Sequence, residues 1–94
     1  LDIARGVIYR KTADNRENAQ AELTQNELKI LHCLLLHKGQ IVSRMDLIEY
    51  LWDQQVFLDD NALSVNMTRI RGKLKEIGLP QDYIKTKRGM GYYI

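Results

Sequence analysis

The side chains that could do chemistry in this chain are concentrated near its C-terminal end, and they suggest the binding of a polyanion. Residues 61–94 contain seven Lys or Arg against two acidic residues, a net charge of +5, whereas residues 1–60 carry −3. Between Asn61 and Lys75 there is no acidic residue. This asymmetry predicts an anionic partner on one side of the molecule, the alternative being a solvated basic surface without a partner. The basic residues are Arg69, Arg71, Lys73, Lys75, Lys85, Lys87 and Arg88.

The residues that usually perform catalysis or bind metals are scarce and poorly spaced. His32 and His37 are five positions apart, about 140° around a helix, and neither is predicted to be partnered with a nucleophile. The only cysteine, Cys33, excludes a disulfide within the chain and a site built from several thiolates. It lies in an apolar run, which favours a buried and unreactive thiol. We therefore expect no catalytic residues, no metal site, no cofactor and no enzymatic activity.

The basic segment begins with a predicted helix over residues 60–77, capped by Asp59 or Asp60. Apolar residues recur along it at spacings of four, three, four and three, so they form one stripe that must face a core. The side chains on the other faces are then available to a partner. The stripe is Leu63, Met67, Ile70, Leu74 and Ile77; the opposite side carries Asn61, Val65, Thr68 and Gly72, with Arg69 on one flank and Ser64 and Arg71 on the other.

A basic hairpin is predicted after this helix. Gly78 and Pro80 end the helix, because glycine adopts the left-handed conformation and proline cannot continue a helix. Residues 83–87 and 91–94 are rich in β-branched and aromatic types and flank the tip Arg88-Gly89-Met90-Gly91. Of the adjacent Tyr92 and Tyr93, one should be buried and the other exposed.

The elements that must position these segments are two earlier helices and a small sheet. Strands are predicted at residues 1–4, 7–10 and 19–23, with a polar turn at 14–18. Thr24 and Glu27 form a capping box for a helix ending at His37, and Ser43 caps a helix that ends at Trp52. The predicted class is α+β in one domain, residues 1–94: an N-terminal antiparallel sheet (1–23), three helices (24–77) and a wing hairpin (83–94).

A helix-turn-helix followed by a β-hairpin is the winged-helix arrangement, in which a helix enters the major groove of DNA and the hairpin reaches the adjacent minor groove. The chain resembles, over essentially its whole length, the C-terminal effector domain of OmpR/PhoB-class bacterial response regulators. The motifs that carry the resemblance are Leu23-Thr24-x-x-Glu27-x-x-Ile30-Leu31, Val42-Ser43-Arg44-x-x-Leu47, Asp60-Asn61-x-Leu63-x-Val65-x-Met67-x-Arg69-Ile70-Arg71-x-Lys73-Leu74 and Ile84-x-Thr86-x-Arg88-Gly89-x-Gly91-Tyr92.

This resemblance implies a set of DNA contacts. Arg can pair with guanine, Asn with adenine, and Val offers an apolar surface to the thymine methyl. An Arg in a narrow minor groove reads mainly groove shape. Arg44 and Arg69 could instead be ordinary surface charges, and Trp52 could belong to the core. The implied contacts are Asn61, Val65, Asn66, Thr68 and Arg69 in the major groove, Arg44, Trp52, Arg71 and Thr86 at phosphates, and Arg88 in the minor groove.

Two residues of the predicted recognition helix depart from the pattern of the class. Thr68 and Gly72 stand where the class often has Arg or Lys, so the groove-facing surface is less basic. Gly72 also costs about 1 kcal/mol of helix propensity relative to alanine. Base preferences of relatives should therefore not be transferred to this chain.

The resemblance also implies partners. They are double-stranded DNA with direct-repeat promoter sites, RNA polymerase through the loop at residues 53–59, and a histidine kinase acting on a receiver domain that this chain lacks. Two effector domains would bind head to tail as a dimer on DNA. No apolar run reaches the roughly 18 residues of a membrane span, and no signal peptide opens the chain, so a cytoplasmic protein without membrane contact is expected. Residues 59–66 and 86–92 most resemble regulators of resistance to antimicrobial peptides. The alternative function is a winged-helix module that binds protein or RNA.

Overall fold

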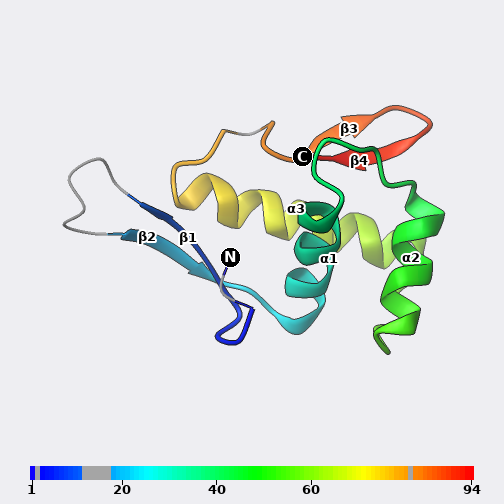
Figure 1. Ribbon diagram of the computed structural model, residues 1–94, viewed down its shortest axis with the longest axis horizontal. Coiled ribbons are helices and arrows are strands. Elements are labelled where there is room, and N and C mark those ends of the chain that lie inside the picture. The colour runs from blue at the N-terminus through cyan, green and yellow to red at the C-terminus, as the bar shows by residue number, and fades with distance from the viewer. Residues whose placement is uncertain (2, 12–17, 81) are drawn as a thin grey trace.

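The computed structural model describes residues 1, 3–11, 18–80 and 82–94, and within them the chain forms three helices and two small sheets (Figure 1). This order confirms the predicted α+β class. The elements are β1 (Val7–Lys11), β2 (Asn18–Glu22), α1 (Gln25–Leu36), α2 (Arg44–Asp53), α3 (Asp60–Glu76), β3 (Lys85–Lys87) and β4 (Gly91–Tyr93).

Each helix begins at a polar cap that satisfies backbone donors of its first turn. Thr24 Oγ1 accepts from the Glu27 backbone N–H at 3.2 Å, and Glu27 Oε1 accepts from the Thr24 backbone N–H at 2.8 Å. Ser43 caps α2 by accepting from the Asp46 N–H at 3.0 Å. Of the two candidate caps for α3, Asp59 is the one used. All three predicted helix starts are thus confirmed.

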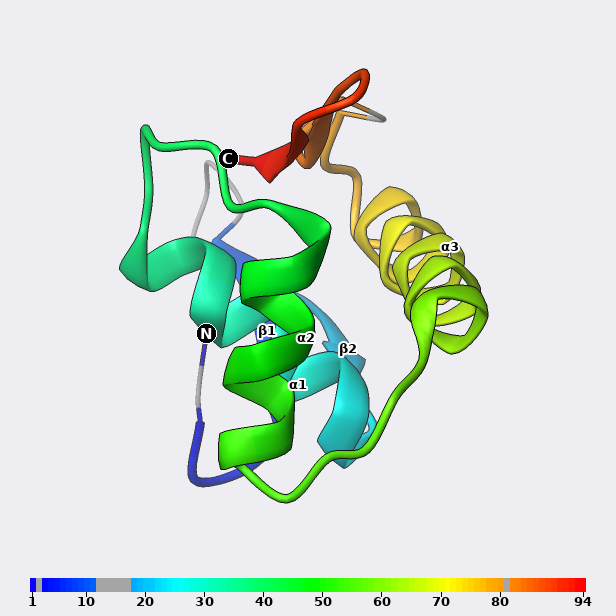
Figure 2. The same ribbon diagram turned by 90° about the vertical axis from the view of Figure 1, so that its right-hand side faces the viewer.

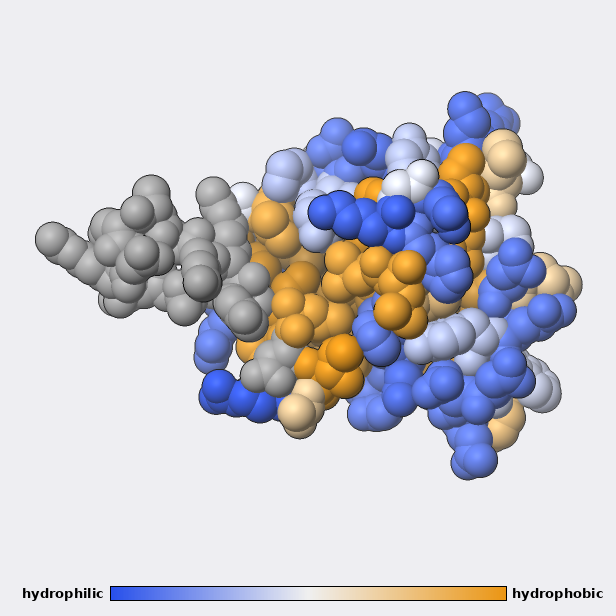
Figure 3. Space-filling model, viewed as in Figure 1, coloured by the Kyte–Doolittle hydropathy of each residue, from blue (hydrophilic) through white to orange (hydrophobic). Residues whose placement is uncertain are grey.

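The core lies between the three helices. The predicted stripe of α3 is buried, with Leu63, Met67, Ile70 and Leu74 at most 1% exposed and Ile77 4% exposed. In Figure 2, α1 and α2 lie together on one side of this core and α3 lies on the other. On the face seen in Figure 3, apolar surface occupies the middle, and hydrophilic side chains lie mainly above it, below it and on its right-hand side. The helical phase inferred from the sequence is therefore the phase that the fold uses.

The N-terminal sheet has two described strands rather than three. β1 and β2 pair antiparallel, from Val7 opposite Glu22 to Lys11 opposite Asn18. The predicted strand at residues 1–4 is wrong where it is described, because residues 3–6 form a turn in which the Gly6 N–H donates to the Ile3 carbonyl at 3.3 Å. Most of the predicted turn at residues 14–18 lies outside the described residues.

The wing is a hairpin that is also paired to the helical body. β3 and β4 run antiparallel, with Thr86 opposite Tyr92 and Lys87 opposite Gly91. On the other edge of β4, Tyr92 exchanges two backbone hydrogen bonds with Val42, at 2.8 and 3.0 Å. The short extended link before α2 therefore acts as a third strand beside the wing. A two-stranded hairpin is marginal alone, so this pairing is needed to hold the wing in place.

Candidate nucleic-acid interface

The solvent-exposed side of α3 brings together four of the five residues predicted to lie in the major groove. Asn61, Val65, Thr68 and Arg69 are all exposed, and Val65 remains 48% accessible although it is aliphatic. An amide, an aliphatic surface, a hydroxyl and a guanidinium are the groups that can read base edges. The exposed face of α3 is therefore equipped to distinguish base pairs.

Asn66 does not share this face. It is only 8% exposed, and its Nδ2 donates to the carbonyl of Ala62 within the helix at 2.9 Å. Asn66 precedes Met67 of the buried stripe, which places it about 60° from the centre of that stripe at about 100° per residue. Its amide is thus used inside α3 and is turned away from the other four.

The wing places a second set of cations next to α3. All three residues of β3 are exposed, and Arg88 is exposed in the turn between β3 and β4. Arg71 reaches from α3 to β3, where its Nη2 donates to the Ile84 carbonyl at 3.0 Å and to Thr86 Oγ1 at 2.7 Å. In Figures 1 and 2 the wing lies above α3. The two predicted DNA-contacting elements are therefore adjacent and directly bonded.

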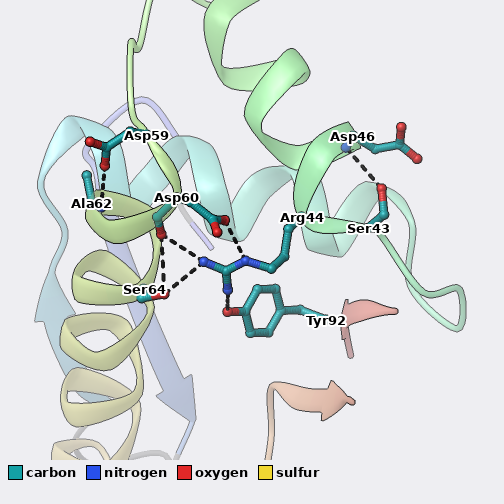
Figure 4. Close-up of polar contacts among 8 residues, drawn as sticks. All are labelled: Ser43, Arg44, Asp46, Asp59, Asp60, Ala62, Ser64 and Tyr92. Carbon is teal, nitrogen blue, oxygen red and sulfur yellow. Dashed lines mark hydrogen bonds and ion pairs between the residues drawn. The ribbon is translucent and has the colours of Figure 1, made fainter. Parts of the chain in front are cut away.

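Arg44, a predicted phosphate ligand, is engaged inside the domain. Its guanidinium donates to the Asp60 carboxylate at 2.7 Å, to Ser64 Oγ at 2.8 Å and to the hydroxyl of Tyr92, as Figure 4 shows. A phosphate contact would have to replace one of these partners or share a donor with it. The sequence motif located Arg44 at the start of α2 but did not indicate these contacts.

Tyr92 is the more buried member of the tyrosine pair, and it joins two arginines. The prediction of one buried and one exposed tyrosine is met only in part, because Tyr93 is partly buried. It is 6% exposed, and the guanidinium carbons of Arg44 and Arg71 lie 5.6 and 5.7 Å from its ring centroid. Such distances permit cation–π attraction. The sequence reasoning did not assign Tyr92 to the site, and the only signal available was its place in the Gly91-Tyr92 motif.

Trp52 was predicted to contact a phosphate, with a place in the core as the alternative. The structure shows that it is not part of the core. Its side chain lies at the end of α2 with 54% of its surface exposed. Its Nε1 donates to the Leu58 carbonyl at 3.3 Å, and its ring meets Phe57 edge to face at 5.0 Å between centroids. The indole N–H therefore already has a partner within the chain.

Two hollows open beside the wing, one between it and the start of α2 and one between it and α3, and cationic side chains line both. One is lined by Arg44, Thr86, Lys87 and residues 89–92, and the other by Arg71, Gly72, Lys75 and Thr86. Hydroxyl, backbone and cationic groups in a concave surface suit the oxygens of a phosphodiester. These two hollows therefore offer positions for a nucleic-acid backbone beside the wing.

Gly72 contributes no side chain to this surface, and the fold does not require it to be glycine. A Cβ added there would meet no heavy atom within 4 Å. Gly72→Ala should raise the free energy of unfolding by about 1 kcal/mol, because alanine restricts the unfolded chain and favours the helix. Urea unfolding would measure this. Gly39→Ala is the matched control: its Cβ also meets nothing, but its φ of +86° should make that substitution destabilising.

Other reactive groups in the described residues give no second chemistry. Burial, with a smaller contribution from Asp46, raises the pKa of the Cys33 thiol to about 11, so little thiolate forms at neutral pH. Within residues 1, 3–11, 18–80 and 82–94, no cluster of three His, Cys, Asp or Glu side chains could hold a metal ion. Nor is any helix in those ranges both long and apolar enough to cross a membrane.

A helix-turn-helix, a basic exposed helix face and a cationic β-wing together define the winged-helix class of DNA-binding domains. Residues 18–94 match the family described as "Transcriptional regulatory protein, C terminal", and the chain belongs to this family. The predicted resemblance to the OmpR/PhoB class is thereby confirmed.

Relatives and solved structures agree with this assignment. The sensory transduction protein BceR of Halalkalibacterium halodurans is 43% identical over 84 residues, which are 89% of this chain and 36% of BceR. The C-terminal domain of the nisin resistance regulator NsrR, a lantibiotic response regulator, is 42% identical with a TM-score of 0.75, covering 90% of this chain and 89% of that one. The Klebsiella pneumoniae RstA DNA-binding domain in complex with the RstA box is 33% identical with a TM-score of 0.63, covering 85% and 77%.

The curated relatives are also longer than this chain. The chain spans about a third of the length of the curated relatives that it matches. The NsrR likeness agrees with the predicted resemblance to regulators of resistance to antimicrobial peptides.

Proposed function

We propose that this chain is the sequence-specific, double-stranded-DNA-binding effector domain of a two-component response regulator. The observation that carries the proposal is the exposed face of α3, which has no acidic residue from Asn61 to Lys75. This face lies beside a cationic wing, and Arg71 of α3 is hydrogen-bonded to Thr86 of that wing. The chain's likeness to the RstA domain, which has been solved in complex with its DNA box, supports the same reading. The relatives that are response regulators support the two-component assignment.

In this proposal α3 reads bases and the wing reads the minor groove. Asn61, Val65, Thr68 and Arg69 contact base edges in the major groove, with Arg69 able to pair with guanine through two parallel hydrogen bonds. Arg88 enters the adjacent minor groove from the wing turn. Arg71 and Thr86 meet phosphates at the hollow that they line. Asn66 is left out of the reading set, because its amide is bonded within α3.

The remaining proposals concern the whole regulator. A histidine kinase phosphorylates a receiver domain, and two effector domains then bind as a dimer on a direct repeat in the cytoplasm. The loop between α2 and α3 meets RNA polymerase. The exposed aromatic surface that Phe57 of this loop forms with Trp52 at the end of α2 would favour such a contact. The likeness to a nisin resistance regulator supports a role in resistance to peptides that attack the cell wall.

Selection of duplexes from genomic fragments, followed by salt titration, tests the DNA-binding proposal. A specific reader should prefer its selected duplex to a scrambled one by a factor of at least about 10³. Its affinity should also fall steeply with salt, because each neutralised phosphate releases counterions. Equal affinity for selected duplex, scrambled duplex and unrelated RNA would reject the proposal in favour of a general polyanion-binding module.

Arg69→Ala and Thr86→Ala separate base reading from backbone contact. Arg69→Ala should weaken the selected duplex by about 1–3 kcal/mol and leave the scrambled duplex nearly unchanged, because a base contact carries sequence information. Thr86→Ala should weaken both duplexes alike, as expected for a phosphate contact. Fluorescence anisotropy with both duplexes measures these losses. Arg69 would be a backbone contact if its replacement weakened the two duplexes equally.

A further inference from the structure

We propose that Arg44 is a positioning residue that fixes the wing relative to the first turn of α3, and so sets the spacing between major-groove and minor-groove reading. The inference rests on the proposed DNA-binding function and deepens it. It replaces the expectation that Arg44 is chiefly a phosphate ligand.

All three nitrogens of the Arg44 guanidinium donate to partners within the domain. Nε donates to Asp60 Oδ1 at 2.7 Å, Nη2 donates to the Asp60 carbonyl at 2.7 Å and to Ser64 Oγ at 2.8 Å, and Nη1 donates to the Tyr92 hydroxyl. A guanidinium has five N–H groups in a rigid planar fork, and these contacts use most of them in defined directions. Figure 4 shows the fork between the three partners. Arg44 therefore connects α3 to the wing through hydrogen bonds and does not project freely to solvent.

On one side, Arg44 bonds to the N-terminal end of α3, which is the end proposed to read DNA. Asp60 is the first residue of α3, and Ser64 follows one turn later, its hydroxyl also donating to the Asp60 carbonyl at 3.3 Å. Asn61 and Val65 come directly after these two residues in the chain. Any shift of Arg44 relative to α3 would therefore change the positions of Asn61 and Val65, which are proposed to contact bases.

On the other side, Arg44 bonds to Tyr92 of the wing strand β4, which lies between β3 and Val42. Tyr92 lies in β4, paired with Thr86 on one side and with Val42 on the other. Its ring is contacted by Arg44 and Arg71, and Arg71 also bonds β3 through Thr86. Because both wing strands have three residues, their orientation depends on such attachments to the helical body. The wing is thus linked to α3 through two arginines and one tyrosine.

Charge explains why Arg44 should keep these partners on DNA. The Asp60 side chain is 69% exposed at the groove-reading end of α3, and Arg44 is its ion-pair partner. If a phosphate took Arg44 away, the Asp60 carboxylate would be left unpaired beside a polyanion, and like charges at short range repel. Retaining the ion pair avoids this repulsion and preserves the geometry of the reading surface.

Arg44→Lys tests positioning against charge. Lysine keeps the positive charge but replaces the planar fork with a single ammonium, which cannot hold Asp60, Ser64 and Tyr92 in the same arrangement. We expect about a tenfold loss on a duplex selected by the wild-type chain, with an unchanged salt dependence. Single base-pair insertions across that duplex should lower the affinity of Arg44→Lys less than that of the wild type, because the spacing between α3 and the wing is less fixed in the variant. Retention of wild-type affinity within twofold, or an unchanged insertion penalty, would overturn the proposal.

A charge-neutral double variant tests the phosphate alternative directly. Arg44→Met with Asp60→Asn removes one cation and one anion together, so the positioning proposal predicts a loss of affinity without a change in salt slope. A phosphate ligand predicts a slope smaller by about one. Lys38→Met with Glu49→Gln is the matched control, since it also removes one charge of each sign from exposed positions, Lys38 in the turn after α1 and Glu49 in α2, and should leave binding unchanged.

Amide hydrogen exchange gives a readout that needs no DNA. In the free wild-type domain the Tyr92 N–H donates to the Val42 carbonyl and the Met90 N–H to the Lys87 carbonyl. Arg44→Lys should speed exchange at both amides while leaving the amides of α1 unchanged. Unchanged wing exchange would refute the positioning role even if DNA binding were confirmed. Faster wing exchange in a chain that proved unable to select duplexes would refute only the DNA-binding function.

Discussion

Replacement of Gly91 by alanine should detach the wing and abolish specific DNA binding. A Cβ at this position would lie 2.0 Å from the Val42 carbonyl oxygen and 2.7 Å from the Ser43 Cα, both of which are backbone atoms. The φ of Gly91 is +152°, a conformation that other residues rarely adopt. The substitution therefore cannot be accommodated by rotating a side chain, and β4 must move away from Val42.

The predicted cost of Gly91→Ala combines overpacking and backbone strain, about 2–4 kcal/mol in the free energy of unfolding. Loss of the Val42–Tyr92 pairing should also displace Arg88 from the minor-groove position that we propose for it. Denaturant unfolding measures the first effect, and anisotropy with selected and scrambled duplexes measures the second. Specific binding should fall to the level of the scrambled duplex.

Gly89→Ala is the matched control for this prediction. Gly89 lies in the same hairpin with a φ of +75°, but an added Cβ would meet nothing within 4 Å. Its replacement should cost only the left-handed conformation, about 1–2 kcal/mol, and should leave the pairing of β4 with Val42 intact. If Gly89→Ala and Gly91→Ala behaved alike, backbone conformation alone would explain both and the close approach to Val42 would be unimportant.

The helices of this fold could be predicted from the sequence because their determinants are local. Thr24 and Glu27 are three residues apart, as are Ser43 and Asp46, and each pair places a side-chain acceptor at a free N–H of the first turn. The apolar repeat of α3 likewise fixed which face is buried. Since three of the predicted base-reading residues lie opposite that repeat and Arg69 lies on its flank, most of the candidate site followed from the same local pattern.

The parts that the sequence did not predict depend on partners far apart in the chain. Arg44 bonds Tyr92 across 48 positions, and no spacing rule indicates that contact. The pairing of Val42 with Tyr92 is equally non-local. Asn66 differs for another reason. Its identity suits adenine, but it lies one residue before Met67, is 8% exposed and donates to the Ala62 carbonyl within the helix. The sequence did not indicate this local bond, and the groove contact of Asn66 stays a prediction.

The wing and the helices also differ in how they are secured. The helices share an apolar core, which Ile84 and Tyr92 join from the wing side. The wing is also held by the backbone pairing of Tyr92 with Val42, by one close glycine contact and by two arginines that meet at Tyr92. The strand β3 and the turn that follows it, residues 85–90, remain exposed. The wing should therefore open at lower free energy than the helical core, which is where amide exchange would detect it first.

A buried ion pair joins the start of α1 to the last turns of α3. Glu27 is 1% exposed, and its Oε1 accepts from Lys73 Nζ at 2.5 Å as well as from the Thr24 backbone N–H. Burial acts to raise the pKa of Glu27, but donation by Lys73 and Thr24 outweighs it, and the pKa lies below the ordinary value of 4.5. The carboxylate is therefore ionised at neutral pH and depends on Lys73 for its charge partner.

Lys73→Met should accordingly destabilise the domain by roughly 2–4 kcal/mol at neutral pH, because it leaves a buried carboxylate without its cation. Urea unfolding measures the loss. Lys75→Met, an exposed neighbour in the same turn, should change stability by less than about 0.5 kcal/mol. Adding Glu27→Gln to Lys73→Met should recover much of the loss, since the amide oxygen can still accept from Thr24 and carries no charge. A Lys73→Met loss that persisted undiminished in the double variant would show that Lys73 acts through packing.

The pH dependence of Lys73→Met follows from the same pair. In the wild type the pKa of Glu27 is lowered by folding, so its contribution to stability is present above the unfolded pKa and is lost as pH falls through the folded pKa. In Lys73→Met the burial of Glu27 is no longer offset by a cation, so its pKa should lie above the unfolded value and protonation should favour the folded state. The stability difference between the two proteins should therefore shrink as pH falls from 7 to below about 4.5. A difference that stayed constant across this range would mean that Glu27 is not the group through which Lys73 stabilises the fold.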